Sequence, residues 1–386
     1  MILLDKPLIS DFVKQSIRDG HFQALDTGNV IEPGEIKLLH DEDVIDNMRN
    51  NPAVNLHTTS ENALKWVYNN LAFTGLPEKI NMFKDKYAFR KLLSDMYPDF
   101  FFRKVHVTEL DSIDISAFPR PFIIKPTIGF FSMGVHKIFD EGGWSVVKEK
   151  IRAEIYEIRS IYPNEVLSLD TYIVEECISG AEYAFDAYFD GDGKAVILGV
   201  LEHPFSGEGD VSDRVYNTSA KIVGANLGVF DEFLAQLQKR ASLKNFSLHV
   251  EVRIDDVGSL VPIEVNPLRF GAWCTSADLT HYAFGFNPYA YYINSIMPDW
   301  TGILPASDES IYSIIILDNS TGYSADKIKG FNYDKLLSRF SSPLELRKIN
   351  YHEYPLFGIL FTKTEPGNYG EIESILHSDL REYIIL

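Results

Sequence analysis

The sequence contains little cysteine, with only Cys177 and Cys274 among 386 residues. Two thiols cannot form a disulfide framework or a four-thiolate zinc site within one chain, and low cysteine use fits a reducing compartment. The N-terminal residues also lack the apolar run of a secretory signal, because they include the charged residues Asp5, Lys6 and Asp11. We therefore expect a soluble, unprocessed cytoplasmic protein.

Positive charge is scarce as well. Lys and Arg total 36 against 55 Asp and Glu, which gives a net charge of −19. Binding to nucleic acid or to an anionic membrane needs a basic face, and no stretch approaches the length of a spanning helix. We expect neither kind of partner, and an anionic ligand would need a local cluster of cations.

The length and composition predict a globular α/β protein. The chain is 45% hydrophobic and 24% charged, and 386 residues are enough for two or three packed units. Strand and helix patterns alternate over about the first 80 residues and again beyond residue 300. The first of these regions lacks G-x-G-x-x-G, so a Rossmann dinucleotide site has no support there.

The cluster of cations is found in residues 79–104, KINMFKDKYAFRKLLSDMYPDFFFRK, which hold seven Lys or Arg and three Asp. Apolar residues recur at nearly helical spacing, which predicts one basic amphipathic helix that ends before Pro98. The simplest alternative for any one of these lysines, including Lys86, is a solvated helix face.

Lys125 ends the apolar strand FIIK and precedes a loop with Gly129, Ser132 and Gly134. An ammonium group and several backbone N–H groups at such a point can bind phosphate oxygens. The loop does not match the Walker A pattern. An ordinary hairpin turn therefore remains an alternative interpretation.

A second strand, YIVEECI, runs into an acidic pair. Glu175 and Glu176 are followed by Cys177 and Ile178, and Glu182 comes shortly after. Main-chain groups at such a strand end can pair with a purine edge, and a later carboxylate can accept from ribose hydroxyls. The alternative is a solvated strand end.

The most specific pattern is the hairpin HVEVRIDDVGSLVPIEVNPLRFG. If residues 256–259 form its loop, Asp255 opposes Leu260 and Glu251 faces Glu264. Facing carboxylates are unfavourable without a cation between them, and such hard oxygen ligands suit Mg²⁺. A different register would place the two glutamates on opposite faces.

In this order, the motifs of residues 80–295 resemble the ATP-grasp superfamily, above all through EVNPLRFG. The resemblance implies ATP and Mg²⁺, or Mn²⁺, as cofactors. It assigns the phosphates to Lys86, Lys125 and the loop residues Gly129, Ser132 and Gly134. It assigns adenine and ribose to Glu175, Glu176, Cys177, Ile178 and Glu182, and the metal to Glu251, Glu264 and Asn266.

The resemblance also implies an α+β grasp architecture. We expect an N-terminal α/β pre-grasp domain over residues 1–80, a two-lobed ATP-grasp domain over 81–300 and a small C-terminal α/β unit over 301–386. The lobes would cover residues 81–174, including the linker helix, and 175–300. The bulky Phe130 and Phe131 depart from the small residues that are common in the glycine loop of relatives.

The implied reaction is ligation, in which a carboxylate is activated by ATP as an acyl phosphate and then joined to an amine. Arg253 and Arg269 are the candidate catalytic cations, and Arg214, in a polar loop, is a candidate for substrate binding or simply a solvated charge. His203 and His249 are expected to be structural. A phosphotransferase and a non-catalytic ATP-binding scaffold remain alternatives, as does a homodimer.

Overall fold

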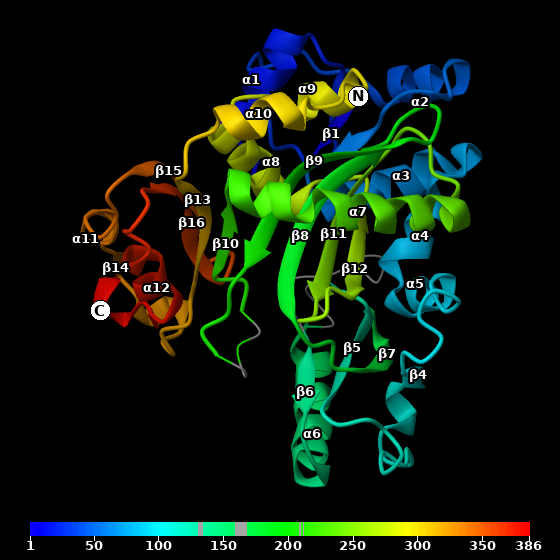
Figure 1. The fold of residues 1–386 in the computed structure, drawn as a ribbon, viewed down its shortest axis with the longest axis vertical. Coiled ribbons are helices and arrows are strands. Elements are labelled where there is room, and N and C mark those ends of the chain that lie inside the picture. The colour runs from blue at the N-terminus through cyan, green and yellow to red at the C-terminus, as the bar shows by residue number, and fades with distance from the viewer. Residues whose placement is uncertain (130–133, 159–167, 208–209, 211) are drawn as a thin grey trace.

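The structure is a computed structural model that describes all residues except 130–133, 159–167, 208–209 and 211. It is mixed α/β, as predicted, and its sheets and helices are shown in Figure 1. The N-terminal part is a parallel sheet of three short strands in the order β2-β1-β3. These strands are β1 (Ile2–Leu4), β2 (Ala24–Asp26) and β3 (His57–Thr58).

Helices α1 (Asp11–Gly20), α2 (Asp41–Asn50) and α3 (Leu64–Asn70) connect and flank this sheet. The Ser10 hydroxyl accepts from the Val13 N–H at 3.2 Å and so caps the start of helix α1.

The basic segment is not one helix, contrary to the prediction. It forms α4 (Leu76–Lys84) and α5 (Lys86–Leu92), which are separated at Asp85. The Asp85 carboxylate accepts from the N–H groups of Tyr87 and Ala88, so it caps α5 and starts a new helix inside the apolar pattern.

A four-stranded antiparallel sheet follows, in the order β4-β7-β5-β6. Its strands are β4 (Phe102–His106), β5 (Phe122–Ile128), β6 (His136–Ile138) and β7 (Ser168–Glu176), and α6 (Glu141–Ile158) packs on it. Phe122, Ile124 and Trp144 lie in the core between sheet and helix. Figure 1 shows this small lobe below the main body of the protein.

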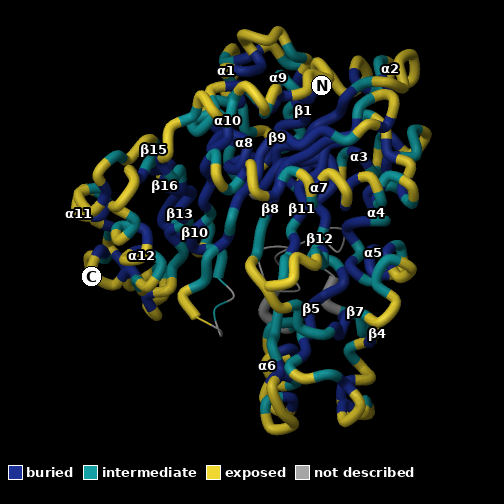
Figure 2. The backbone as a smooth tube through the Cα atoms, viewed as in Figure 1, coloured by how far each residue is buried: buried dark blue, intermediate teal, exposed yellow. Residues whose placement is uncertain are grey.

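The main body contains an eight-stranded sheet in the order β12-β11-β8-β9-β10-β13-β16-β15. Its central strands are β8 (Ala181–Phe189), β9 (Ala195–His203), β10 (Val215–Thr218), β11 (Phe246–Ile254) and β12 (Leu260–Pro267). Helix α7 (Ala220–Ala241) covers one face, where Phe230 stacks on Phe185 at 4.4 Å. Helix α8 (Gly271–Phe284) covers the other, where Leu279 packs in the cluster that includes Ala184. Neighbouring residues of β8 thus face different helices, which explains why these strands are apolar on both sides. Figure 2 shows the resulting buried centre.

Residues 301–386 extend this same sheet with β13 (Ile311–Asp318), β15 (Pro343–Lys348) and β16 (Leu356–Thr364). Strand β13 pairs with β10 in an antiparallel ladder from Val215↔Ile315 to Thr218↔Tyr312. The remaining elements are β14 (Gly330–Phe331), β17 (Ile384–Ile385), α11 (Tyr333–Leu337) and α12 (Gly370–Leu376). The division into domains at residues 80 and 300 remains a prediction, although the sheet itself is continuous across the second boundary.

Helices α9 (Pro288–Ile293) and α10 (Trp300–Ala306) return to the N-terminal part. Asn55 donates from Nδ2 to the carbonyl of Tyr292 at 2.8 Å, and the Tyr292 hydroxyl donates to the carbonyl of Leu56 at 3.0 Å. In the part of the chain that is described, every helix is too short or too polar to cross a bilayer.

Candidate active site

The hairpin of β11 and β12 places Glu251 directly opposite Glu264, as the sequence predicted. The path to this register differs from the expected one. Ile254, not Asp255, opposes Leu260, and an extra residue at Ile263 forms a bulge that brings Glu264 back into line with Glu251. Asp255 belongs to the turn, because its carboxylate accepts the N–H groups of residues 257 and 259.

The two facing glutamates have opposite electrostatic surroundings. Burial, followed by the charges of Glu264, Glu182 and Asp213, raises the pKa of Glu251 well above its usual range. Burial alone would also raise the pKa of Glu264, but Lys86, together with Lys125 and Asn266, outweighs burial and lowers that pKa to about 2. Lys86 Nζ lies 2.8 Å from Glu264 Oε2. Among the described residues, Glu251 has no lysine or arginine at ion-pair distance; His249 Nε2 lies 3.7 Å from its Oε1.

This donor set fits a magnesium ion. Asn266 lies next to Glu264, to which its Nδ2 donates at 3.1 Å, so an amide accompanies the two carboxylates. Within the described residues no three His, Cys, Asp or Glu side chains form a metal-binding group, so the candidate site depends on that amide as its third donor. A divalent cation would offset the charge left on Glu251.

The two predicted phosphate lysines are both buried and lie on different elements. Lys86, on α5, also donates to the carbonyl of Gly129 at 3.0 Å, so it connects the glycine loop to β12. Lys125, on β5, lies 2.6 Å from Glu175 Oε1. Gly134 adopts a φ of +70°, which favours glycine. Ser132, with Phe130 and Phe131, lies outside the described residues.

Arg90 connects the two sheets and was not foreseen from the sequence. Its Nε lies 2.8 Å from Glu175 Oε2, and its Nη1 donates to the carbonyl of Pro262 at 2.5 Å. It sits on α5 one turn after Lys86, and it is buried. The i,i+4 spacing of two cations in KYAFR was the signal that could have identified it.

In the segment predicted to bind adenine, residues 175–178 at the end of β7, some backbone groups already have hydrogen-bond partners within the protein. The N–H of Glu176 donates to the carbonyl of Phe101, and that of Cys177 to the carbonyl of Pro121. The carboxylate of Glu175 is fully engaged by Arg90 and Lys125, and these cations outweigh burial and lower its pKa to about 2. Any contact of Glu175 with a base would therefore come from its main chain.

Glu182, Arg253 and His203 form a connected group beside this segment. Arg253 donates from Nε to Glu182 Oε2 at 2.9 Å and from Nη1 to the carbonyl of Ile178 at 3.0 Å. His203 Nδ1 lies 3.0 Å from Glu182 Oε1. His249 pairs with Asp186 at 2.7 Å. The two histidines thus hold carboxylates in place.

Arg269 contacts the N-terminal part of the protein. Its Nη2 donates to Glu61 Oε1 at 2.9 Å, and Glu61 also pairs with Lys84. Burial lowers the pKa of Arg269, but Glu61 outweighs it and raises that pKa above its usual value. Glu61 was not identified from the sequence, because no local pattern connects it to Arg269, which lies 208 positions away.

Arg214 is not brought together with these groups by any described contact. Its guanidinium lies 2.8 Å from Asp318 Oδ1 and donates to the Ser320 hydroxyl at 2.7 Å. The side chain is only 4% exposed, so it is not the solvated loop charge considered as an alternative. Its substrate role remains a prediction.

Comparisons with known proteins agree with this geometry. Residues 118–277 match the ATP-grasp domain family. The structure is similar to an L-amino acid ligase from Bacillus licheniformis, with a TM-score of 0.67 and 16% identity over 100% of this chain and 98% of that one. It is also similar to N5-carboxyaminoimidazole ribonucleotide synthetase from Thermotoga maritima, with a TM-score of 0.60 and 14% identity over 97% and 96% of the two chains.

A third similar structure is biotin carboxylase from Campylobacter jejuni, with a TM-score of 0.59 and 11% identity over 94% and 87% of the two chains. No curated protein is significantly similar in sequence. At these identities the likeness establishes the fold and not the substrate. The chain therefore has the ATP-grasp fold, and its residues 118–277 match the model of the ATP-grasp domain, as the sequence motifs indicated.

Proposed function

We propose that this protein is an ATP-dependent ligase that joins a small-molecule carboxylate to an amine or similar nucleophile and releases ADP and phosphate. The observation that carries the proposal is the partly buried pair of Glu251 and Glu264, which lie opposite each other on β11 and β12. Lys86 of α5 lies 2.8 Å from Glu264, and the charge of Arg269 acts on Glu251. The solved proteins of this fold named above support the same class of reaction.

In the first step, an oxygen of the substrate carboxylate attacks the γ-phosphorus of ATP, and the bond to ADP breaks. Lys86 and Lys125 would bind the phosphates, and Glu251, Glu264 and Asn266 would hold Mg²⁺ or Mn²⁺, which supplies charge stabilisation for the transferred group. Phosphoryl transfer depends on positioning and charge more than on a covalent nucleophile of the protein. The lysines are held ready by their carboxylate partners, Glu264 and Glu175.

In the second step, the amine attacks the acyl carbon, the bond to phosphate breaks, and the amine loses a proton. Arg253 and Arg269 are the proposed cations for the negative charge that develops on the acyl oxygen. Each is already oriented by a carboxylate, Arg253 by Glu182 and Arg269 by Glu61. Glu182 would also accept from the ribose, and the main chain from Glu175 to Ile178 would contact adenine.

The test is a phosphate-release screen of carboxylic acids crossed with amines, with ADP and AMP measured separately. We expect phosphate and ADP to form only with Mg²⁺ and with both substrates present. The Glu264→Gln variant should lose this turnover, whereas Glu232→Gln, at an exposed position of α7, should retain it.

Each other outcome contradicts the proposal in a different way. AMP as the product would exclude the acyl-phosphate route. A stable phosphorylated product without need of an amine would indicate a phosphotransferase. ATP binding without turnover for any acid would indicate a scaffold, and unchanged turnover in Glu264→Gln would exclude the metal assignment.

A further inference from the structure

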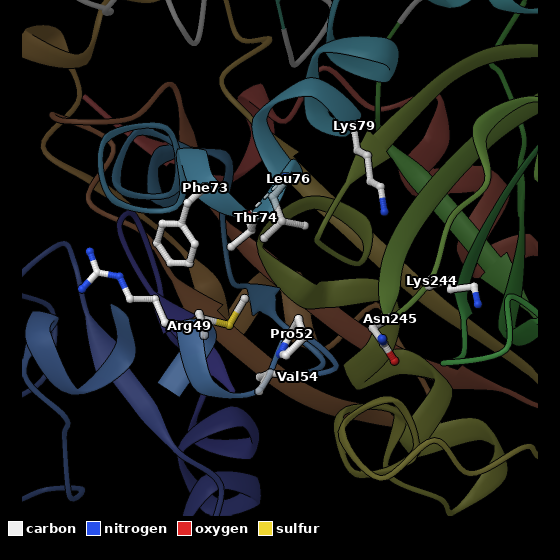
Figure 3. A pocket seen from close by; sticks show the side chains of 10 residues that line it. Arg49, Pro52, Val54, Phe73, Thr74, Leu76, Lys79, Lys244 and Asn245 are labelled. Carbon is white, nitrogen blue, oxygen red and sulfur yellow. Dashed lines mark hydrogen bonds between the residues drawn. The ribbon is translucent and has the colours of Figure 1, made fainter. Parts of the chain in front are cut away.

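A separate pocket of about 280 Å³ lies at the boundary between the N-terminal sheet and the eight-stranded sheet (Figure 3). It is lined by the end of α2 and the turn that follows, by the start of α4, and by the residues just before β11. Leu56 and Phe246 form a parallel bridge beside it, so the two sheets are joined there. The pocket therefore has walls from both parts of the protein.

The pocket is distinct from the candidate active site. Asn245 lines it and immediately precedes β11, whereas Glu251 lies six residues further along the extended chain. At about 3.3 Å per strand residue, the two positions are roughly 20 Å apart. No residue that the active site uses lines this pocket.

All charged residues that line the pocket are cations, namely Arg49, Lys79 and Lys244. No carboxylate is among the lining residues, although Asp and Glu outnumber Lys and Arg by 55 to 36 in the whole chain. Arg49 has one acidic neighbour outside the pocket, Asp46 at 3.4 Å, and both side chains are largely exposed. The pocket is therefore a local positive site on an acidic protein.

The two lysines are close enough to repel each other. Burial, and after it the charge of Lys244, lowers the pKa of Lys79. Within the described residues, the ammonium groups of Lys79 and Lys244 have no hydrogen-bond or ion-pair partner that would offset this repulsion. An anion between them would relieve it.

Apart from Thr74 and Asn245, the rest of the lining is apolar. Met48 and Leu76 are 4% and 9% exposed, so they form a closed floor, and Phe73 is 49% exposed at the rim. The guanidinium of Arg49 lies 5.3 Å from the centre of the Phe73 ring. Figure 3 shows Phe73 and Leu76 between Arg49 on one side and Lys79 on the other.

We propose that this pocket binds a small organic anion with an apolar body, such as an aromatic or branched aliphatic carboxylate or phosphomonoester. The cations would bind the acidic head, and the apolar floor would bury the body. The volume is near the lower end of the range for ligand pockets, which begins at about 300 Å³, and so favours a compact molecule.

The probe for the test is 1-naphthyl phosphate, titrated by calorimetry into the full-length protein. A non-hydrolysable ATP analogue with Mg²⁺ is present at saturation, so that the nucleotide site is filled. We expect one further binding site. Replacement of both lysines, Lys79→Gln with Lys244→Gln, should weaken binding at least tenfold, and the matched variant Lys221→Gln, at an exposed position of α7, should not change it.

Two further titrations test the ligand class. Neutral 1-naphthol and inorganic phosphate should each bind at least tenfold more weakly than 1-naphthyl phosphate. Equal binding of naphthol would show that charge plays no part, and equal binding of phosphate would show that the apolar floor plays none. Either result would overturn the proposal. Unchanged affinity in the double lysine variant would also overturn it, provided that the variant unfolds at the same temperature as the native protein. The test does not depend on the ligase activity, so the two proposals can fail separately.

Discussion

Arg269 donates from Nη2 to Oε1 of Glu61 at 2.9 Å, across 208 positions of sequence. Glu61 lies at the start of the helical segment that leads into α3, so the N-terminal part holds a candidate catalytic cation of the grasp domain. Both side chains are largely buried, and Lys84 pairs with the same carboxylate. The N-terminal part thus contributes to the geometry of the site.

The Glu61→Gln variant should lose both stability and activity. It removes the carboxylate that pairs with both Arg269 and Lys84, and breaking a buried ion pair costs about 3 kcal/mol. We expect the free energy of unfolding to fall by about that amount in urea denaturation and kcat to fall as well. Glu78→Gln, at an exposed position of α4, is the control and should change neither. Unchanged stability in Glu61→Gln would contradict a buried pairing.

Arg90→Lys tests whether Arg90 positions the glutamate pair. Arg90 holds the carbonyl of Pro262, next to the bulge that sets Glu264 opposite Glu251, and lysine cannot keep this bond together with the one to Glu175. We expect about a tenfold higher Mg²⁺ concentration for half-maximal turnover, with the melting temperature little changed. The neighbouring exposed Lys91→Ala should leave the Mg²⁺ dependence unaltered. A loss of stability alone would assign Arg90 a purely structural role.

Lys125→Ala should weaken ATP binding. A hydrogen bond between charged groups contributes about 1.5–3 kcal/mol, so the dissociation constant should rise at least about tenfold. Equilibrium dialysis with a non-hydrolysable ATP analogue measures this directly. Lys104→Ala, at an exposed position of β4, serves as the control. Unchanged affinity in Lys125→Ala would exclude its phosphate role.

His57 should make the protein less stable in acid. Burial, followed by the charges of the N-terminal ammonium and Arg269, lowers the pKa of His57 to about 3. Below about pH 6.5 the unfolded chain takes up a proton there and the folded chain does not, so stability falls as pH decreases from about 6.5 to about 3. At pH 5 the loss is about 2 kcal/mol relative to neutral pH.

The measurement is urea unfolding at pH 7.5 and pH 5 for the native protein and for His57→Gln. The glutamine can still bond to Ser247, which lies 3.2 Å from His57 Nδ1. We expect the variant to lose about 2 kcal/mol less between the two pH values. An identical pH dependence would show that His57 is protonated in the fold.

Local patterns predicted much of the candidate site. The alternation of side chains along β11 and β12 was enough to place Glu251 opposite Glu264. The predicted turn was wrong, because the observed turn is one residue longer than expected. The bulge at Ile263 offsets this extra residue, so Glu251 and Glu264 still face each other. The pattern of apolar residues in this segment predicts neither the longer turn nor the bulge.

The elements that sequence reasoning missed depend on single polar residues or on distant pairing. Asp85 divides the basic segment because its carboxylate caps a new helix in the middle of a continuous apolar stripe. The polar segment around Arg214, which was expected to be a loop, leads directly into β10, whose partner β13 lies about 100 residues later. Helix α7 begins at Ala220 because the Ser219 hydroxyl caps it. Arg90 and Glu61 belong to the same class, since their partners come from other parts of the chain.

The pairing of β10 with β13 limits how the chain can be shortened. A protein that ended before Ile311 would leave the outer edge of β10 without its ladder from Val215 to Thr218. It would also uncover Val215, which packs with Ile315 and Leu317. An exposed apolar edge of this kind recruits strands from other molecules. The last segment of the chain therefore protects the central sheet from self-association, whatever else it does.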